Sequence, residues 1–261
     1  EQMRRMLCGV VVIVVVISGF AGGAAASTPP SDPGAGGLYE GGYGNASEPY
    51  QIANWTQLNN TRKNLDANFT LINDLNESTA GYESVANETA NGGNGFVPIA
   101  NGPGEFDGTF NGTNHTIQNL SIDRNSDDVG LFSVSTGLIK NVSLVTVNIS
   151  DTANSNVGGL VGVNDGTVSN VSVSGNIAGD NRVGGVVGRN YETISNASVS
   201  GNTTGLGDSV GGLVGRNSGT VSNSSVSGNA TGSGPNVGGL VGSNSGKIND
   251  SYATGDVSGV D

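Results

Sequence analysis

A segment of about 27 residues recurs along the second half of the chain, and this repeat limits the possible folds more than any other feature. Four copies begin with Val-Gly-Gly, at Val157, Val183, Val210 and Val237, and a more divergent copy begins at Val129. Successive copies start 28, 26, 27 and 27 residues apart. A fixed period of this length is typical of proteins in which each repeat is one structural unit that stacks on its neighbours.

The composition of the copies selects one repeat architecture. No copy shows the periodicity of a helix, which excludes helical and leucine-rich solenoids, and a propeller blade needs ~40–50 residues. Glycine accounts for 45 of the 261 residues and aromatic residues for only 5%, so short strands joined by tight turns are expected. We therefore predict an all-β fold, a parallel β-solenoid (β-helix) whose coils of about 27 residues each contribute about three short strands.

Stacked coils place equivalent residues in columns. The apolar positions are expected to line the interior, because each coil repeats the positions of its neighbour. Paired glycines are expected at a bend that a Cβ atom would obstruct. The apolar columns are Leu160, Leu213 and Leu240; Val173, Val199 and Val226; and Val168 with Val221; the paired glycines are at 158–159, 184–185, 211–212 and 238–239.

Asparagine also recurs, in two registers. In a solenoid, stacked Asn amides can hydrogen-bond from coil to coil. We predict this structural role for the column Asn164, Asn190, Asn217 and Asn244. The second set, assigned as Asn141, Asn170, Asn196, Asn223 and Asn249, begins an Asn-x-Ser sequon in every copy. For this set a ladder and N-glycosylation both remain open, and at a given site the two exclude each other.

The chain contains 17 such sequons, against roughly 6 expected from its content of Asn, Ser and Thr. Copying of the repeat inflates this number, but nine sequons lie before the repeats and preserve the excess. We therefore predict N-glycosylation of an exported protein, with Asn45, Asn54, Asn76 and Asn87 as the candidate sites.

The N-terminus has the organisation of a secretory signal. The basic pair Arg4-Arg5 precedes an aliphatic run over residues 10–17, and three alanines at 24–26 supply a small-residue cleavage site. The apolar stretch is shorter than the ~20 residues that a membrane span requires. Residues 1–26 are thus predicted to be a signal peptide, by either the general or the twin-arginine route. Cys8, the one cysteine, lies inside it, so the mature chain has no disulfide and no thiolate site.

Three further regions follow this segment. Residues 27–47 are rich in Pro, Gly and Ser, as in a flexible linker. Residues 48–128 are predicted to form an N-terminal cap and irregular first coils, with a short amphipathic helix over 52–65. Residues 129–261 are the regular coils. Because the fifth copy ends without a capping element, we expect the sequence to be incomplete at its C-terminus, with more coils, a cap or an anchor beyond it.

Charge and side-chain chemistry limit the classes of function that the chain can have. The net charge of −12 disfavours nucleic-acid binding, which needs a basic surface. With only three lysines, the composition also fits a salt-rich environment. The acidic residues of the repeats do not recur at one register, and His115 has no second histidine beside it. We therefore expect no catalytic residue, no metal site and no cofactor.

The repeats resemble the GLUG motif, a Gly-Leu-any-Gly core that is visible as GGLVG at 158–162, 211–215 and 238–242. The last copy, with its terminal SYATG, is also similar to the family pattern. The resemblance covers residues 48–261 and implies a surface or secreted, adhesin-like protein without catalytic residues. We expect a non-catalytic exported protein, structural or adhesive, whose partners are surface glycans or other cell-surface proteins. Membrane contact is expected only through the signal segment or a missing C-terminal anchor. The alternative is a polysaccharide-binding or polysaccharide-cleaving β-helix module.

Overall fold

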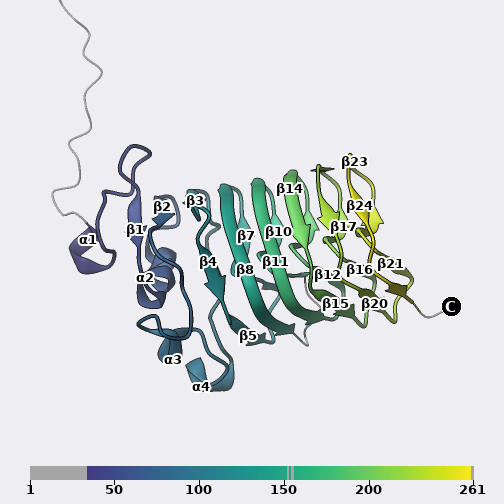
Figure 1. Cartoon of the computed structure of the whole chain (residues 1–261), viewed down its shortest axis with the longest axis horizontal. Coiled ribbons are helices and arrows are strands. Elements are labelled where there is room, and N and C mark those ends of the chain that lie inside the picture. Colours follow the sequence, from purple (N-terminus) through teal and green to yellow (C-terminus); the bar gives the residue numbers. More distant parts are fainter. Residues whose placement is uncertain (1–33, 152, 154–155, 260–261) are drawn as a thin grey trace, which may run out of the picture. The chain divides into compact units, whose positions relative to one another are not determined.

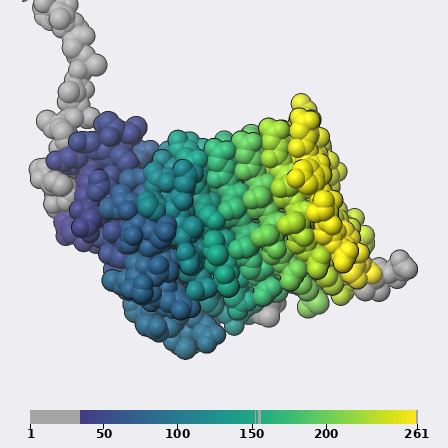
Figure 2. All heavy atoms as spheres, in the orientation of Figure 1, coloured from purple at the N-terminus to yellow at the C-terminus, as the bar shows by residue number. Residues whose placement is uncertain are grey.

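The computed structural model describes residues 34–151, 153 and 156–259. These residues form a parallel β-solenoid in which the chain winds through three sheets, one coil stacked on the next (Figure 1). Figure 2 shows the coils as successive bands of colour, so that residues close in space belong to neighbouring repeats. The predicted fold class is confirmed. The predicted signal peptide lies outside the described residues.

The long sheet contains 15 strands, the other two contain five each, and all their strand pairs are parallel. The long sheet is built from β1 (Tyr50–Ile52), β2 (Asn68–Leu71), β3 (Thr109–Asn111), β4 (Thr116–Gln118), β5 (Ser121–Arg124), β8 (Leu138–Asp151), β11 (Thr167–Gly179), β14 (Thr193–Val199), β15 (Asn202–Gly205), β18 (Thr220–Ser222), β19 (Ser225–Val226), β20 (Ala230–Gly232), β23 (Lys247–Asn249), β24 (Tyr252–Ala253) and β25 (Val257–Ser258). The second sheet is β7 (Phe132–Ser135), β10 (Val161–Asn164), β13 (Val187–Asn190), β17 (Val214–Asn217) and β22 (Val241–Asn244). The third is β6 (Asp128–Val129), β9 (Asn156–Gly158), β12 (Arg182–Gly184), β16 (Ser209–Gly211) and β21 (Asn236–Gly238).

The pairing register places equivalent residues of successive repeats side by side. Val168 lies between Ile139 and Ile194, and Ile194 is followed by Val221. All four side chains are fully buried. Val168, Ile194 and Val221 alternate with outward Ser and Thr, which produces one apolar and one polar face along each of these strands. The apolar columns therefore form the core, as the repeat predicts.

The N-terminal region contains more strand and less helix than its sequence predicts. Helix α2 covers only Trp55–Asn60 and is followed by the 3-10 turn η1 (Thr61–Lys63). Ile52, assigned to the predicted helix over 52–65, instead pairs with Leu71 in the sheet. Asn54 begins α2, because its side chain accepts a hydrogen bond from the backbone N–H of Gln57.

Three further helical turns occur among the residues that the structure describes, each four residues long. They are α1 (Gly34–Gly37), α3 (Tyr82–Val85) and α4 (Ala90–Gly93). Backbone angles in α1 and α4 include left-handed residues, so these two elements are tight turns rather than regular helix. Turns α3 and α4 extend sideways from the first coils (Figure 1).

Residues 34–47, which the sequence assigns to a flexible linker, differ from that expectation. The Tyr39 ring is buried and stacks on Tyr50, with ring centroids 4.4 Å apart. Its hydroxyl donates to the backbone oxygen of Asn60 at 2.9 Å. The segment therefore packs over the first coil: Tyr39 belongs to the core, and Ala35 and Leu38 pack against it and supply the cover that the end of the core requires.

One side chain in the core is buried with a hydroxyl that makes no hydrogen bond. Thr203 is fully buried between Ile177 and Ala230 of the neighbouring coils. Within the described structure, its Oγ1 has no hydrogen-bond partner. A buried polar group in this state costs ~1–3 kcal/mol.

We expect the substitution Thr203→Val to raise the free energy of unfolding by about 1 kcal/mol, since valine keeps the shape and removes the hydroxyl. Urea denaturation of the two proteins measures this difference. The exposed neighbour Thr204 provides the control, because Thr204→Val removes a hydroxyl that water already solvates. A loss of stability in Thr203→Val would contradict the assignment.

Candidate functional site

The predicted asparagine column lies inside the solenoid, at the end of the second sheet. Asn164 Nδ2 donates to Asn190 Oδ1 at 2.7 Å, Asn190 Nδ2 to Asn217 Oδ1 at 2.8 Å, and Asn217 Nδ2 to Asn244 Oδ1 at 2.7 Å. The first three are fully buried, while Asn244 is exposed. Each buried amide also donates to the backbone oxygen two residues on, as Asn190 does to Glu192. This column joins the coils and closes a turn, so it is structural and offers no ligand a surface.

A second asparagine ladder lies on the surface of the long sheet. Asn141 donates to Asn111 at 3.0 Å, Asn170 to Asn141 at 3.2 Å, and Asn196 to Asn170 at 3.0 Å. Asn141, Asn170, Asn196 and Asn223 all have left-handed backbone angles, with φ between 49° and 54°. Asparagine tolerates this conformation better than other residues that carry a side chain. The four residues thus share one backbone conformation, and Asn141, Asn170 and Asn196 also hydrogen-bond from coil to coil.

The sequence alignment of this ladder is wrong in its last copy. Asn249 pairs with Ser222, one position before the ladder. Asp250 has the left-handed angle, φ 46°, that the equivalent residue of every regular coil adopts. The two adjacent polar residues, Asn249 and Asp250, make the alignment ambiguous in sequence, and only the backbone conformation resolves it.

Serine columns line a shallow groove along the same face. Ser143 and Ser172 lie in register with Ser198 and Ser225 of the following coils, and the Oγ atoms of the first two are 2.7 Å apart. The groove encloses about 440 Å³. Its lining is hydroxyl and aliphatic, with no charged side chain among the residues that form it. The surface can therefore form hydrogen bonds but supplies no acid or base.

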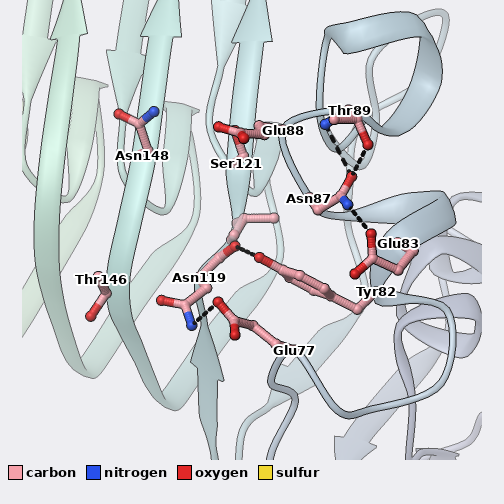
Figure 3. Close-up of a pocket in the computed structure, with 11 residues that line it drawn as sticks. Glu77, Tyr82, Glu83, Asn87, Glu88, Thr89, Asn119, Ser121, Thr146 and Asn148 are labelled. Carbon is pink, nitrogen blue, oxygen red and sulfur yellow. Dashed lines mark hydrogen bonds between the residues drawn. The ribbon is translucent and has the colours of Figure 1, made fainter.

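A larger and more acidic hollow lies beside the first coils, where α3 and the following loop face the long sheet (Figure 3). It encloses about 520 Å³, and a second hollow of about 470 Å³ shares four of its residues. The lining residues are Glu77, Tyr82, Glu83, Asn87, Glu88, Thr89, Asn119, Leu120, Ser121, Thr146 and Asn148. Three separate segments contribute them, so no sequence motif marks the hollow.

Hydrogen bonds fix several of these side chains. The Tyr82 hydroxyl donates to the backbone oxygen of Asn119 at 3.0 Å, and Asn119 Nδ2 donates to Glu77 Oε1 at 3.0 Å. Asn87 Nδ2 donates to Glu83 (Figure 3). Partial burial raises the pKa of Tyr82, and the negative charges of Glu77, Glu83 and Glu88 raise it further. Carboxylates and amides can hydrogen-bond a polyhydroxyl ligand, and an aromatic ring can stack on it.

The four candidate glycosylation sites all lie in the N-terminal region and all have turn-forming side chains. Oδ1 of Asn45, Asn76 and Asn87 accepts from the hydroxyl of the Ser or Thr two residues on, at 2.8, 2.7 and 3.1 Å. Asn54 Oδ1 instead accepts from Gln57 at the start of α2. These side chains are half-buried, and their use as glycan sites stays a prediction.

His115 lies in a turn, and its Nδ1 is 3.0 Å from Asp74 Oδ1. Asp74 also accepts from the backbone N–H of Thr116, and this bond is the main reason that the pKa of Asp74 is lowered. Within residues 34–151, 153 and 156–259, no cluster of three His, Cys, Asp or Glu side chains is arranged to hold a metal ion. In the same residues, no helix is long and apolar enough to cross a membrane.

The parallel sheets, the 27-residue coils and the two amide ladders define the second half of the chain as a β-helix repeat array. Residues 153–178, 179–204, 207–231 and 233–258 match the family described as "The GLUG motif". The chain therefore carries four consecutive GLUG repeats, and the resemblance drawn from the GGLVG segments is confirmed. The divergent copy at Val129 lies outside the matched residues, although β6 pairs it in register with Val157.

Two other comparisons extend beyond the motif. The chain is 40% identical over 149 residues to halomucin from Haloquadratum walsbyi (strain DSM 16790 / HBSQ001). The match covers 54% of this chain and 2% of halomucin. It therefore spans only a small part of that relative. The crystal structure of a candidate immunoglobulin A1 protease from Bacteroides ovatus is similar, with a TM-score of 0.69, 25% identity, and coverage of 87% of this chain and 73% of that one. This coverage extends the structural likeness into the N-terminal coils.

Proposed function

We propose that this chain is part of an exported, non-catalytic β-helix protein of the cell surface or the surrounding medium, with a structural or adhesive role. The observation that carries the proposal is the outward face of the long sheet, where Ser, Thr and Asn recur in register over successive coils. Such a face repeats the same hydrogen-bonding groups every ~4.8 Å. The likeness to halomucin and the GLUG repeats support an extracellular location.

The partners proposed for this face are surface glycans or other cell-surface proteins. Hydroxyl and amide groups hydrogen-bond both sugars and polypeptide. The lining of the serine groove on this face carries no charged side chain, so it adds no local repulsion of acidic partners to that of the net charge of −12. The same net charge opposes binding of nucleic acid.

Protease treatment of intact cells of the native host tests the location. We expect the protein to be degraded, or to be found in the culture medium, while a cytoplasmic marker stays intact. Beads coated with the purified protein then test adhesion, and beads coated with heat-unfolded protein are the control. Full protection of the chain inside intact cells would contradict the proposed location, and equal attachment of both kinds of bead would contradict adhesion through the folded face.

The acidic hollow favours a second candidate, the binding or cleavage of polysaccharide. Glu77, Glu83 and Glu88 supply carboxylates around the Tyr82 ring, and parallel β-helices can hold acid pairs that cleave glycosidic bonds. Calorimetric titration with soluble polysaccharides and an assay for new reducing ends distinguish binding from cleavage. If the hollow is the site, Glu83→Gln lowers affinity at least tenfold, whereas Glu105→Gln, an exposed residue that does not line the hollow, leaves it unchanged.

A further inference from the structure

Seven of the eight sequons of the repeats fall into two columns on the long sheet, which differ in their hydrogen bonding; the eighth, at Asn249, lies one position before the first column. In the surface ladder, the Nδ2 atoms of Asn141, Asn170 and Asn196 each donate to the amide of the preceding coil. The second column lies further along each coil, where Asn148 in β8 is in register with Asn176 in β11, and Asn176 with Asn202 in β15. The next coil continues it with Asn229.

In the second column, both the Asn side chain and the Thr side chain of a sequon are exposed to solvent. Asn202 and Thr204 are exposed on the outward face of β15, while Thr203 between them points into the core. Asn229 and Thr231 repeat this arrangement at β20. Alternation along a strand produces this geometry, because residues two apart share a face.

The amide nitrogens of this column are unoccupied. In the described part of the chain, no hydrogen bond engages Nδ2 of Asn202 or of Asn229, and Asn229 uses only its Oδ1, which accepts from the backbone N–H of Asp256 at 3.0 Å. Asn148 is less open, because it borders the acidic hollow and the hydroxyl of its sequon, Ser150, donates to Asp123 at 2.8 Å.

We propose that Asn202 and Asn229 are N-glycosylation sites of the folded solenoid, and that Asn141, Asn170 and Asn196, whose amide nitrogens are hydrogen-bonded in the ladder, are not. This inference rests on the proposed export of the protein. A lipid-phosphate-linked oligosaccharide is the donor. The Asn Nδ2 atom forms a bond to the anomeric carbon of the first sugar, the bond from that carbon to the phosphate oxygen breaks, the lipid phosphate leaves, and the amide nitrogen loses one proton.

The two columns differ in what this reaction costs. Asn141, Asn170 and Asn196 must first break a coil-to-coil hydrogen bond, and a glycan on them would prevent the bond from re-forming. Asn202 and Asn229 lose no intramolecular bond of Nδ2. Glycans at these positions would shield the neighbouring strands from proteases.

Glycopeptide mass spectrometry of the protein from its native host tests the proposal. We expect modified peptides that contain Asn202 and Asn229, and unmodified peptides that contain Asn170 and Asn196. Modified Asn170 or Asn196 together with unmodified Asn202 and Asn229 would overturn the proposal.

A gain-of-site variant makes the test independent of natural occupancy. Asn176 belongs to the open column but lacks a sequon only because Ala178 follows it by two residues. Ala178 lies between Ser150 and Thr204 in the sheet, so Thr is compatible with this position. We expect Ala178→Thr to complete the sequon and add a glycan at Asn176. Ala178→Val is the control: valine has the shape of threonine but no hydroxyl, so no glycan is expected.

The location of the same samples separates the two proposals. Extracellular protein without glycan at Asn202, at Asn229 and at Asn176 of Ala178→Thr would overturn this inference and leave the proposed export standing. Unmodified protein that stays inside the cell would overturn both.

Discussion

Replacing Gly212 with valine should lower the free energy of unfolding by about 3 kcal/mol and the melting temperature by about 10 °C. A Cβ atom at this position would lie 2.1 Å from the backbone oxygen of Gly239 and 2.6 Å from Cγ1 of Val226. The first of these atoms is backbone in the next coil, so relief requires that two coils move apart. Gly212 is not in the left-handed region, and its requirement is therefore close packing rather than backbone freedom.

Ser218→Val provides the matched control for this prediction. Ser218 is exposed in the turn after β17, where other copies carry Asp165, Tyr191 and Ser245. The added methyl groups meet solvent, and we expect a change within about 0.5 kcal/mol. Differential scanning calorimetry measures both variants. Equal losses of melting temperature would show that the paired glycines do not lie at a close contact between coils.

The second large effect is expected at Asn190, in the middle of the buried amide column. Asn190→Leu removes the acceptor for Asn164 and the donor to Asn217 Oδ1 and to the backbone oxygen of Glu192. Because Asn164 and Asn217 are fully buried and would lose these bonds without access to water, we expect a loss of about 3–5 kcal/mol. Asn244→Leu, at the exposed end of the same column, should cost less than about 1 kcal/mol, and similar losses at the two positions would contradict the role of burial.

Asn190→Asp separates hydrogen bonding from shape and makes stability depend on pH. An ionised aspartate accepts hydrogen bonds but cannot donate one. Its carboxylate therefore cannot replace the hydrogen bond that Asn190 donates to Asn217 Oδ1. Burial raises the pKa of such a carboxyl in the folded state above its unfolded value. We therefore expect Asn190→Asp to gain stability relative to the parent protein as the pH falls through that raised pKa, since the neutral acid donates again. A stability difference that is independent of pH would contradict this account.

The repeat predicts the regular part of the fold because identical residues must occupy equivalent places in every coil. Val168 and Leu160, whose equivalents are apolar in the other copies, identify the core without any knowledge of the strand ends. The Asn164 column follows from the same argument. The spacing of the repeats did not place Asn249 correctly, because both Asn249 and Asp250 could occupy the ladder position in sequence. The left-handed backbone of Asp250 shows that Asp250 occupies it.

The N-terminal coils were harder to predict because they carry no period. The near-helical spacing of Ile52, Trp55 and Leu58 also fits a strand followed by a single helical turn, and pairing of Ile52 with Leu71 across the sheet favours the strand. Tyr39 lies in a stretch rich in Gly and Pro, so its packing on Tyr50 depends on a tertiary contact that composition does not show.

The acidic hollow was missed for a related reason. Glu77, Glu83 and Glu88 lie on an excursion from the first coils, and Asn119 and Asn148 face them from the sheet. The five residues share no spacing or motif. Only the stacking of coils, which brings residues about 30 positions apart into contact, assembles them into one surface.

The register of the coils underlies every part of this account, and engineered cysteines test it directly. In a Cys8→Ser background the chain has no cysteine, and the Oγ atoms of Ser143 and Ser172 are 2.7 Å apart. We predict that Ser143→Cys with Ser172→Cys forms a disulfide under mild oxidation, detected by mass spectrometry of the linked peptides. Ser143→Cys with Ser198→Cys, two coils apart at roughly 9.6 Å between Cα atoms, should not, because a disulfide requires ~4.4–6.8 Å. A link in the second pair and none in the first would contradict the β-solenoid register.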